Sequence, residues 1–156
     1  MSETDNIILR FANENDIDAI VEFNRRMAHE TEGKELKVET LRPGVEGLIE
    51  NSKYGFYVIA EDAANGKKAG GLLITYEWSD WRNGPIWWIQ SVYVMPDYRR
   101  RGIYRKLYAY VKEIARREPN VRGFRLYVEK ENTTAQRTYK SLGMEETHYL
   151  MFEEMF

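Results

Sequence analysis

The chain has 156 residues, of which 43% are hydrophobic and 31% charged, and its formal net charge is −2 at pH 7. This length and composition are typical of one globular domain with its own hydrophobic core, so we expect a single domain over residues 1–156. The slightly negative charge argues against a general nucleic-acid binder, whose surface carries a large basic excess. The absence of cysteine excludes disulfides, thiolate metal sites and a cysteine nucleophile.

The N-terminal residues, MSETDNIILRF, have no basic region and only a short apolar run. We therefore expect neither a signal peptide nor a membrane anchor here, and no later stretch approaches the length needed to span a bilayer. His29 and His148 are isolated, and no carboxylates cluster at ligand spacing, so we expect no metal site. These features predict a cytoplasmic enzyme or binding protein that has neither a membrane nor a nucleic-acid partner.

The first predicted elements are a strand and a helix. Residues 7–11 alternate enough to form a short strand, and Asn13 or Asn15 can cap the helix that follows. The apolar residues of this helix are three or four positions apart, which places them on one face. They are Ile17, Ile20, Val21 and Met27.

The next segment is more polar. Residues 29–39 (HETEGKELKVE) contain a glycine and many charges, which predicts a loop. A second helix is expected within residues 38–51, and Pro43 and Gly44 should split it, because proline lacks a backbone N–H and glycine is flexible.

The middle of the chain predicts three successive strands joined by two hairpins. Asn65 and Gly66 form a dipeptide that strongly favours a tight hairpin turn. Apolar and aromatic residues fill the flanking segments, as in strands of a half-buried sheet. The strands are expected at residues 56–61, 69–78 and 86–95, and the second hairpin loop at residues 79–85.

The last third alternates between helices and strands. After a Pro96–Asp97 turn, apolar residues at helical spacing predict a helix, and residues 124–128 alternate as in a strand. A short helix is expected from Asn132 to Leu142, ended by Gly143, and a last strand at residues 147–152. The fold class is therefore α/β, with a mixed sheet.

Residues 98–108 (YRRRGIYRKLY) place three consecutive arginines and a glycine where a strand turns into a helix. The first N–H groups of a helix lack internal partners and lie at the positive end of its dipole. Such a turn suits a phosphate-bearing ligand. The alternatives are a solvated basic turn or a patch for RNA.

Two motifs resemble those of the GNAT N-acetyltransferases. Residues 99–104 (RRRGIY) resemble the family's fingerprint Arg/Gln-x-x-Gly-x-Gly/Ala and depart from it at Tyr104. The segment Asn132-x-x-Ala135-x-x-x-Tyr139, followed by LGM, matches the family's N-x-x-A-x-x-x-Y-x-x-x-G-F/M pattern. The resemblance implies a mixed, mostly antiparallel sheet with a central splay, flanked by helices on both faces.

The resemblance also implies acetyl-CoA as cosubstrate. Backbone N–H groups from Arg100 to Arg105 would surround the pyrophosphate, where Gly102 allows close approach, and arginine side chains would add charge-assisted bonds. The pantetheine arm would lie along the edge of residues 92–94 like an added strand. The implied cofactor-binding residues are Val92, Tyr93, Val94, Arg99, Arg100, Arg101, Gly102, Ile103, Tyr104, Arg105, Asn132 and Ala135.

Tyr139 would stand near the thioester sulfur and act as the general acid, because a phenol stays protonated at neutral pH. On its own it would more often be an amphipathic core tyrosine. The implied reaction is direct attack of a primary amine on the acetyl carbonyl, with a backbone N–H near Val92 as oxyanion donor. Glu77 ranks above Asp80 as the base.

The acceptor is predicted to be a small-molecule amine, either a polyamine or a lysine-like group. Aromatic residues at the second hairpin are either core, a dimer face, or an ammonium site with nearby acids. The residues 87–99 are similar to diamine acetyltransferases, but Gln90–Ser91 replaces their Glu-Asp pair, so polyamine specificity does not simply transfer. The candidate substrate residues are Trp78, Asp80, Trp81 and Gln90, and a homodimer is expected.

Two other classes of function remain open at this point. One is a non-catalytic acyl-CoA-binding or sensor domain with the same fold. The other is an RNA- or protein-binding module that uses the arginine turn.

Overall fold

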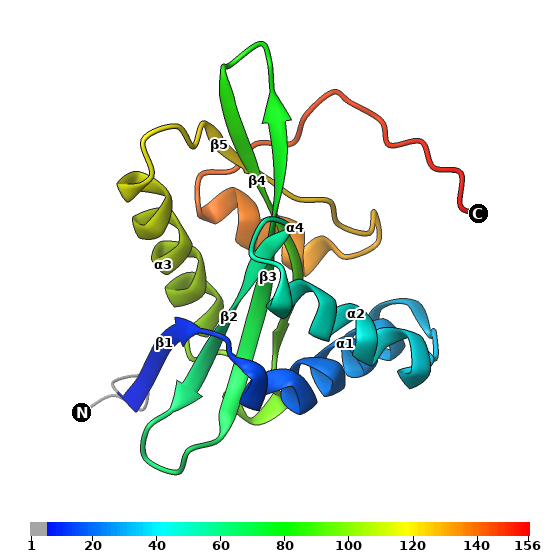
Figure 1. Cartoon of the computed structure of the whole chain (residues 1–156), viewed down its shortest axis with the longest axis vertical. Coiled ribbons are helices and arrows are strands. Elements are labelled where there is room, and N and C mark those ends of the chain that lie inside the picture. Colours follow the sequence, from blue (N-terminus) through cyan, green and yellow to red (C-terminus); the bar gives the residue numbers. More distant parts are fainter. Residues whose placement is uncertain (1–5) are drawn as a thin grey trace.

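One mixed sheet organises the described part of the chain, residues 6–156 of this computed structural model, with helices on both of its faces (Figure 1). The sheet order is β1-β2-β3-β4-β5; the first four strands pair antiparallel, and β5 pairs parallel to β4. This confirms the predicted α/β class. The strands are β1 (Ile7–Phe11), β2 (Gly55–Asp62), β3 (Lys68–Ser79), β4 (Gly84–Val94) and β5 (Gly123–Arg125).

Four α-helices cover the two faces of this sheet. In Figure 1, α3 lies on one side of the sheet, and α1 and α2 lie on the other. The helix α4 follows β5, and the residues just after it pack on the same apolar cluster as α3. The helices are α1 (Ile17–Glu32), α2 (Val38–Glu50), α3 (Ile103–Arg117) and α4 (Thr133–Ser141), with short 3₁₀ turns η2 (Glu14–Asp16) and η3 (Pro96–Tyr98).

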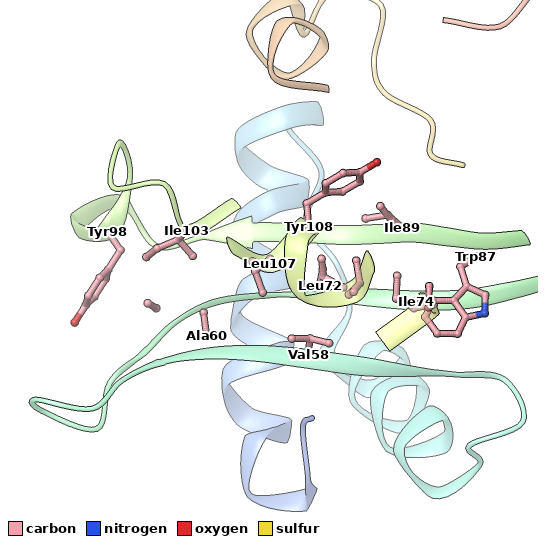
Figure 2. Packing of buried hydrophobic residues seen from close by; sticks show 13 residues of the cluster. Val58, Ala60, Leu72, Ile74, Trp87, Ile89, Tyr98, Ile103, Leu107 and Tyr108 are labelled. Atoms are coloured by element: carbon pink, nitrogen blue, oxygen red, sulfur yellow. The ribbon is translucent and has the colours of Figure 1, made fainter. Parts of the chain in front are cut away.

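Alternation along the strands produces two apolar cores, one on each face. Val58 and Ala60 of β2 point towards α3, whereas Tyr57 and Ile59 point towards α1 and α2. Figure 2 shows Val58, Leu72 and Ile74 of the sheet facing residues of α3. Burial on both faces explains why β2 reads as a continuous apolar run. The α3 residues in this core include Ile103, Leu107, Tyr108 and Val111.

The N-terminal helices differ from the predictions in two ways. The predicted loop at residues 29–39 is too long, because α1 continues to Glu32 and ends at Gly33, which has a left-handed φ of 63°. The predicted split of the second helix is wrong, since α2 runs unbroken with Pro43 inside it. Val45 is only 2% exposed and packs α2 into the core. The free energy gained from this burial offsets the loss of the backbone hydrogen bond that Pro43 cannot donate.

The C-terminal strands also differ from the predictions. The strand expected at residues 124–128 is limited to β5, and the strand expected at residues 147–152 is wrong, because this segment has no strand structure. A strand forms only against a partner, and β4 pairs with β5 over just three residues. The predicted strands at residues 7–11, 56–61, 69–78 and 86–95 are confirmed to within a few residues.

An ion network around the buried Asp16 connects η2 to strands β1 and β3. Arg10 donates to both oxygens of Asp16 at 2.7 and 2.9 Å, and Lys68 lies 2.9 Å from the same carboxylate. Burial alone would raise the pKa of Asp16, but hydrogen bonds from Arg10, the Asn13 backbone and Lys68 hold it well below its usual range. Asn13 caps η2, whereas the residue before α1 is Asp16, so the predicted cap lies on the 3₁₀ turn and not on the α-helix itself.

Candidate active site

The predicted splay lies between β4 and the segment that follows β5. The two strands pair only from Ile86 to Trp88, and among the described residues no strand pairs with that edge of β4 further along. On the other side of β4, the register shifts so that Ser91 and Val92 stand opposite Leu72. This is a β-bulge, with Ser91 at a left-handed φ of 52°, and it bends the strand away. The backbone of residues 92–94 therefore borders an open gap.

The N-terminus of α3 is open to a ligand beside this gap. Gly102 is the residue before the helix; it has a φ of 73°, and a Cβ built there would meet nothing within 4 Å. No side chain caps the helix, and its first turn carries no acidic residue. The amide groups of Ile103, Tyr104 and Arg105 thus remain available to an anion. The geometry is that of a small phosphate-binding turn.

The arginines of the motif have different roles. Arg100, itself at a left-handed φ of 63°, and Arg105 are exposed and form no ion pair within residues 6–156. The guanidinium of Arg101 lies over the ring of Tyr98, 5.2 Å from its centre. The side chain of Arg99 instead contacts Val94 and Glu30. Of the arginines at residues 99–105, only Arg100 and Arg105 are therefore both exposed and without an ion pair to another described residue.

Arg99 connects the end of β4 to the end of α1. Its Nε donates to the carbonyl of Val94 at 2.9 Å, and its Nη2 donates to Glu30 at 2.8 Å. The hydroxyl of Tyr93 donates to the other oxygen of Glu30, also at 2.8 Å. Partial burial raises the pKa of Glu30, but the bonds from Tyr93 and Arg99 lower it overall. This connection spans more than sixty residues of sequence and has no local signal.

The second motif positions α4 across the gap. The Oδ1 of Asn132 accepts from the N–H of Ala135 at 3.1 Å, which confirms Asn132 as the cap of α4. Gly143 follows the helix at a φ of 94°, and the N–H of Met144 bonds back to Tyr139 in a Schellman motif. Both ends of the helix are therefore fixed by the motif's own residues.

Tyr139 packs against Tyr104, the residue that departs from the family pattern. The ring centres are 5.6 Å apart, with an interplanar angle of 52°. Burial raises the pKa of Tyr139, and the neighbouring Tyr104 hydroxyl lowers it in part. Burial raises the pKa of Tyr104 far above its usual range. The Tyr104 hydroxyl is buried and has no hydrogen-bond partner among the described residues.

Glu77 belongs to a polar patch on the other face of the sheet. One carboxylate oxygen accepts from Trp88 Nε1 at 3.0 Å, and the other accepts from Arg125 at 2.7 Å. Gln90 lies on the same face and donates its amide N–H to the hydroxyl of Thr75. The predicted base is thus near the start of the gap, with both oxygens already in use.

The aromatic hairpin tip is separate from this patch. Trp78 is next to Glu77 in β3, and by strand alternation its side chain points to the opposite face. Trp81 is 87% exposed, and Asp80 accepts from its N–H in the turn. The structure does not bring Trp78, Asp80 and Trp81 together with Glu77 and Gln90.

An acidic cleft of about 690 Å³ lies between the end of α1 and the segment before α4. Glu129 and Glu131 have no sequence signal that links them to this cleft, because they are far from Glu30 in the sequence. The cleft is lined by Glu30, Thr31, Glu32, Lys34, Glu129, Glu131 and Asn132.

In the described residues, no group of His, Cys, Asp or Glu could hold a metal ion. No described helix combines the length and apolar character of a membrane span.

Comparison with known proteins agrees with this geometry. Residues 17–144 match the Acetyltransferase (GNAT) family. A possible acetyltransferase from Clostridium difficile 630 has a similar solved structure, with 46% identity, a TM-score of 0.89, and coverage of 96% of this chain and 97% of that one. The chain therefore belongs to the GNAT acetyltransferase family and is an acyltransferase.

Two further proteins are similar to this chain, one in sequence and one in fold. The mouse (Mus musculus) thialysine N-epsilon-acetyltransferase is 29% identical over 144 residues, which are 88% of this chain and 84% of that protein. The fold is also that of AAC(6')-Iy, solved with the bisubstrate analogue CoA-S-monomethyl-acetylneamine. That structure shares 20% identity and has a TM-score of 0.74, with coverage of 96% of this chain and 98% of that one.

Proposed function

We propose that the protein transfers an acetyl group from acetyl-CoA to a primary amine of a cationic small molecule, within a ternary complex. The observation that carries this proposal is the unpaired edge of β4, which opens between the free N-terminus of α3 and Tyr139. Family membership and the amine-acetylating names of the relatives support the same chemistry.

In this proposal the acetyl-CoA pyrophosphate binds at the start of α3. The N–H groups of residues 103–105 donate to it, and the exposed guanidinium groups of Arg100 and Arg105 add charge. The residues 92–94 supply backbone groups to the pantetheine amides, as a strand edge would to an added strand. Asn132 and Ala135 border the same arm from the α4 side. Arg99 and Arg101 act indirectly, by holding the loop in place.

The chemical step forms a C–N bond and breaks the C–S bond of the thioester. The acceptor arrives as an ammonium ion and must lose one proton before it attacks. That proton passes to Glu77 through water, since both carboxylate oxygens are already bonded. A backbone N–H near Val92 polarises the acetyl carbonyl. Tyr139 donates its phenolic proton to the departing thiolate, and the proton that the nitrogen loses as the amide forms returns to Tyr139 through water. Burial raises the pKa of Tyr139, which keeps its proton in place at neutral pH before the reaction.

The acidic cleft supports a cationic acceptor. Four carboxylates and one lysine line it, so its field attracts ammonium groups and repels the phosphates of CoA. We therefore place the acceptor here and at the face bearing Glu77 and Gln90, with the polar patch nearer the acetyl group. A polyamine or a lysine-like amine carries a second positive charge, which the carboxylates of this cleft would attract.

A second candidate is a non-catalytic acyl-CoA sensor with the same site. It is favoured by the engagement of both Glu77 oxygens, which leaves no free carboxylate in the polar patch. The RNA-binding alternative loses support, because Arg99 and Arg101 make intramolecular contacts and do not form a continuous basic surface.

Two measurements separate these functions. Thermal unfolding in the presence of acetyl-CoA should show a midpoint that rises with ligand concentration. Release of free CoA should then be followed with a panel of diamines, lysine analogues and aminoglycosides. Stabilisation with CoA release for at least one amine supports the enzyme, and stabilisation without any release supports the sensor. No stabilisation by acetyl-CoA would contradict both.

A further inference from the structure

Arg125 places a positive charge on the acceptor face, the sheet face that bears Glu77 and Gln90, where the gap opens. It is the last residue of β5 and the register partner of Trp88, where the pairing of β4 with β5 ends. Its Nη1 donates to Glu77 at 2.7 Å. Glu77 also accepts from Trp88, so these three side chains lie on the same face. A ligand that brings its amine towards Glu77 therefore also meets this guanidinium.

The protein uses only part of the hydrogen-bonding capacity of Arg125. A guanidinium has five N–H donors, and the bond to Glu77 is the one hydrogen bond that Arg125 makes within residues 6–156. The side chain is 30% exposed, so a small ligand has access to it. Guanidinium groups match carboxylates especially well, because two parallel N–H groups donate to the two oxygens. Arg125 can therefore hold a carboxylate in addition to Glu77.

Two aromatic rings lie beside this ion pair. The ring of Trp88 is 6.2 Å from the ring of Tyr127, which follows two positions after Arg125. The Tyr127 side chain is 64% exposed. Together the rings offer apolar surface to the methylene groups of a small acceptor, as the walls of ligand sites commonly do. The polar patch thus combines a cation, a carboxylate and an apolar wall.

The acidic cleft carries the opposite charge on the same side of the sheet. Glu30 lines the cleft and accepts from Tyr93, which packs in the core under α1 and α2. Trp88 points to that side as well, because its neighbour Trp87 packs in the core under α3. A diamine carries only positive charges, so the cleft attracts it while Arg125 repels it. A molecule with both a carboxylate and an ammonium group matches both charges.

We propose that the acceptor is an amino acid with a second amine in its side chain, and that Arg125 binds its carboxylate. One amine accepts the acetyl group, and the other keeps its positive charge and is attracted by the acidic cleft. This inference rests on the acetyl transfer proposed above and selects the lysine-like acceptor over the polyamine. The carboxylate takes no part in the transfer step. It positions the amine, and the same guanidinium discriminates against diamines.

The first test compares three acceptors that differ in this one group: lysine, lysinamide and cadaverine. Lysinamide has a neutral amide in place of the carboxylate, and cadaverine is the diamine that remains when lysine loses it. Release of CoA gives kcat/KM for each. Lysine should exceed both others by about 10- to 100-fold, the usual effect of a hydrogen-bonded charged group. Equal values for lysine and cadaverine would overturn this inference and leave acetyl transfer to amines standing. No release with any of the three would overturn it too, and the other amines of the panel would then show whether acetyl transfer fails as well.

The second test uses Arg125→Gln and measures the ratio of kcat/KM for lysine to that for cadaverine. Loss of the contact with Glu77 should lower both values, whereas loss of the carboxylate site lowers the value for lysine alone. The ratio should therefore fall towards one, and Arg125→Lys should keep part of it, because lysine retains the charge without the two parallel donors. Circular dichroism checks that each variant is folded. Arg116→Gln removes an exposed arginine of α3 and should keep the wild-type ratio. An unchanged ratio in Arg125→Gln would show that Arg125 serves Glu77 alone and would overturn the inference.

Discussion

The rings of Tyr104 and Tyr139 meet at 5.6 Å, which joins the start of α3 to the middle of α4 across the gap beside β4. Each tyrosine comes from one of the two sequence motifs, so the contact brings the phosphate turn and the proposed general acid into one unit. A glycine or alanine at position 104 would leave Tyr139 without this ring. The residue that departs from the family pattern therefore packs against the residue that we propose as the general acid.

Tyr139→Phe should lower kcat by about 10²- to 10⁴-fold, the usual contribution of a general acid. The KM for acetyl-CoA should change little, because the ring and its packing against Tyr104 are retained. Steady-state kinetics measure both constants. Tyr110→Phe removes a comparable hydroxyl from the surface of α3 and serves as the control. A kcat equal to wild type across the pH range would show that Tyr139 is not the acid.

Tyr104→Phe should shift the alkaline limb of the pH–rate profile. Burial raises the pKa of Tyr139, and the nearby Tyr104 hydroxyl lowers it in part, although the two hydroxyls do not meet in a hydrogen bond of ordinary geometry. Without that hydroxyl the pKa of Tyr139 rises further, so the acid stays protonated and active to higher pH. Because the removed hydroxyl is buried and unpaired, the free energy of unfolding should be unchanged or slightly larger. An alkaline limb moving to lower pH would contradict this relationship.

Gly102→Asp should weaken acetyl-CoA binding, since it places a carboxylate where the pyrophosphate is proposed to lie. Isothermal titration gives the dissociation constant directly. Gly102→Asn is the matched control; asparagine has a similar shape and tolerates the left-handed φ of 73°, but it carries no charge. The aspartate variant should bind more weakly than the asparagine variant. Equal affinity in the two would locate the phosphate site elsewhere.

Glu77→Gln should reduce kcat with amine acceptors and flatten the acidic limb of the pH–rate profile, because a proton acceptor is lost. Part of the loss in kcat should come from destabilisation of the fold, because the neutral glutamine no longer forms an ion pair with Arg125. Thermal unfolding separates the two contributions, and the exposed Glu50→Gln is the control. If the acidic limb is unchanged while stability falls, Glu77 is a structural ion-pair residue only.

Asp16→Asn should destabilise the fold by about 3–5 kcal/mol, because it removes one partner of a buried ion pair. The folded-state pKa of Asp16 is depressed, so its stabilisation is complete above the unfolded value of about 3.9 and is lost as the pH falls below it. Denaturant unfolding between pH 7 and pH 2 should show a shallower acid loss in the variant. The exposed Glu14→Gln should behave as wild type, and a variant equally sensitive to acid would contradict the assignment.

The parts of the fold that could be predicted from sequence are those with a local signal. Alternation gave β1 to β4, and the spacing of Ile103, Leu107 and Val111 gave α3, because periodicity records which face is buried. Asn132 and Gly143 gave the ends of α4, because caps are short-range features. Pro43 was misleading, since packing of Val45 in the core keeps α2 intact.

The long-range parts of the site could not be predicted. Nothing near Glu30 in the sequence indicates that it binds Tyr93 and Arg99, because the contact depends on how α1 crosses β4. The β-bulge at Ser91 could not be predicted either, because a serine does not indicate a left-handed backbone conformation. The strand predicted at residues 147–152 has the residue pattern of a strand, but it has no neighbouring strand among the described residues.

We propose that this site moves an acetyl group onto a cationic amine. The most direct measurement is mass spectrometry of the acceptor after incubation with isotope-labelled acetyl-CoA, using diamines, lysine analogues and aminoglycosides. We expect labelled N-acetyl product from at least one of these amines, in amounts equal to the free CoA formed, and much less product with Tyr139→Phe. Binding of acetyl-CoA with no labelled product from any amine would contradict it.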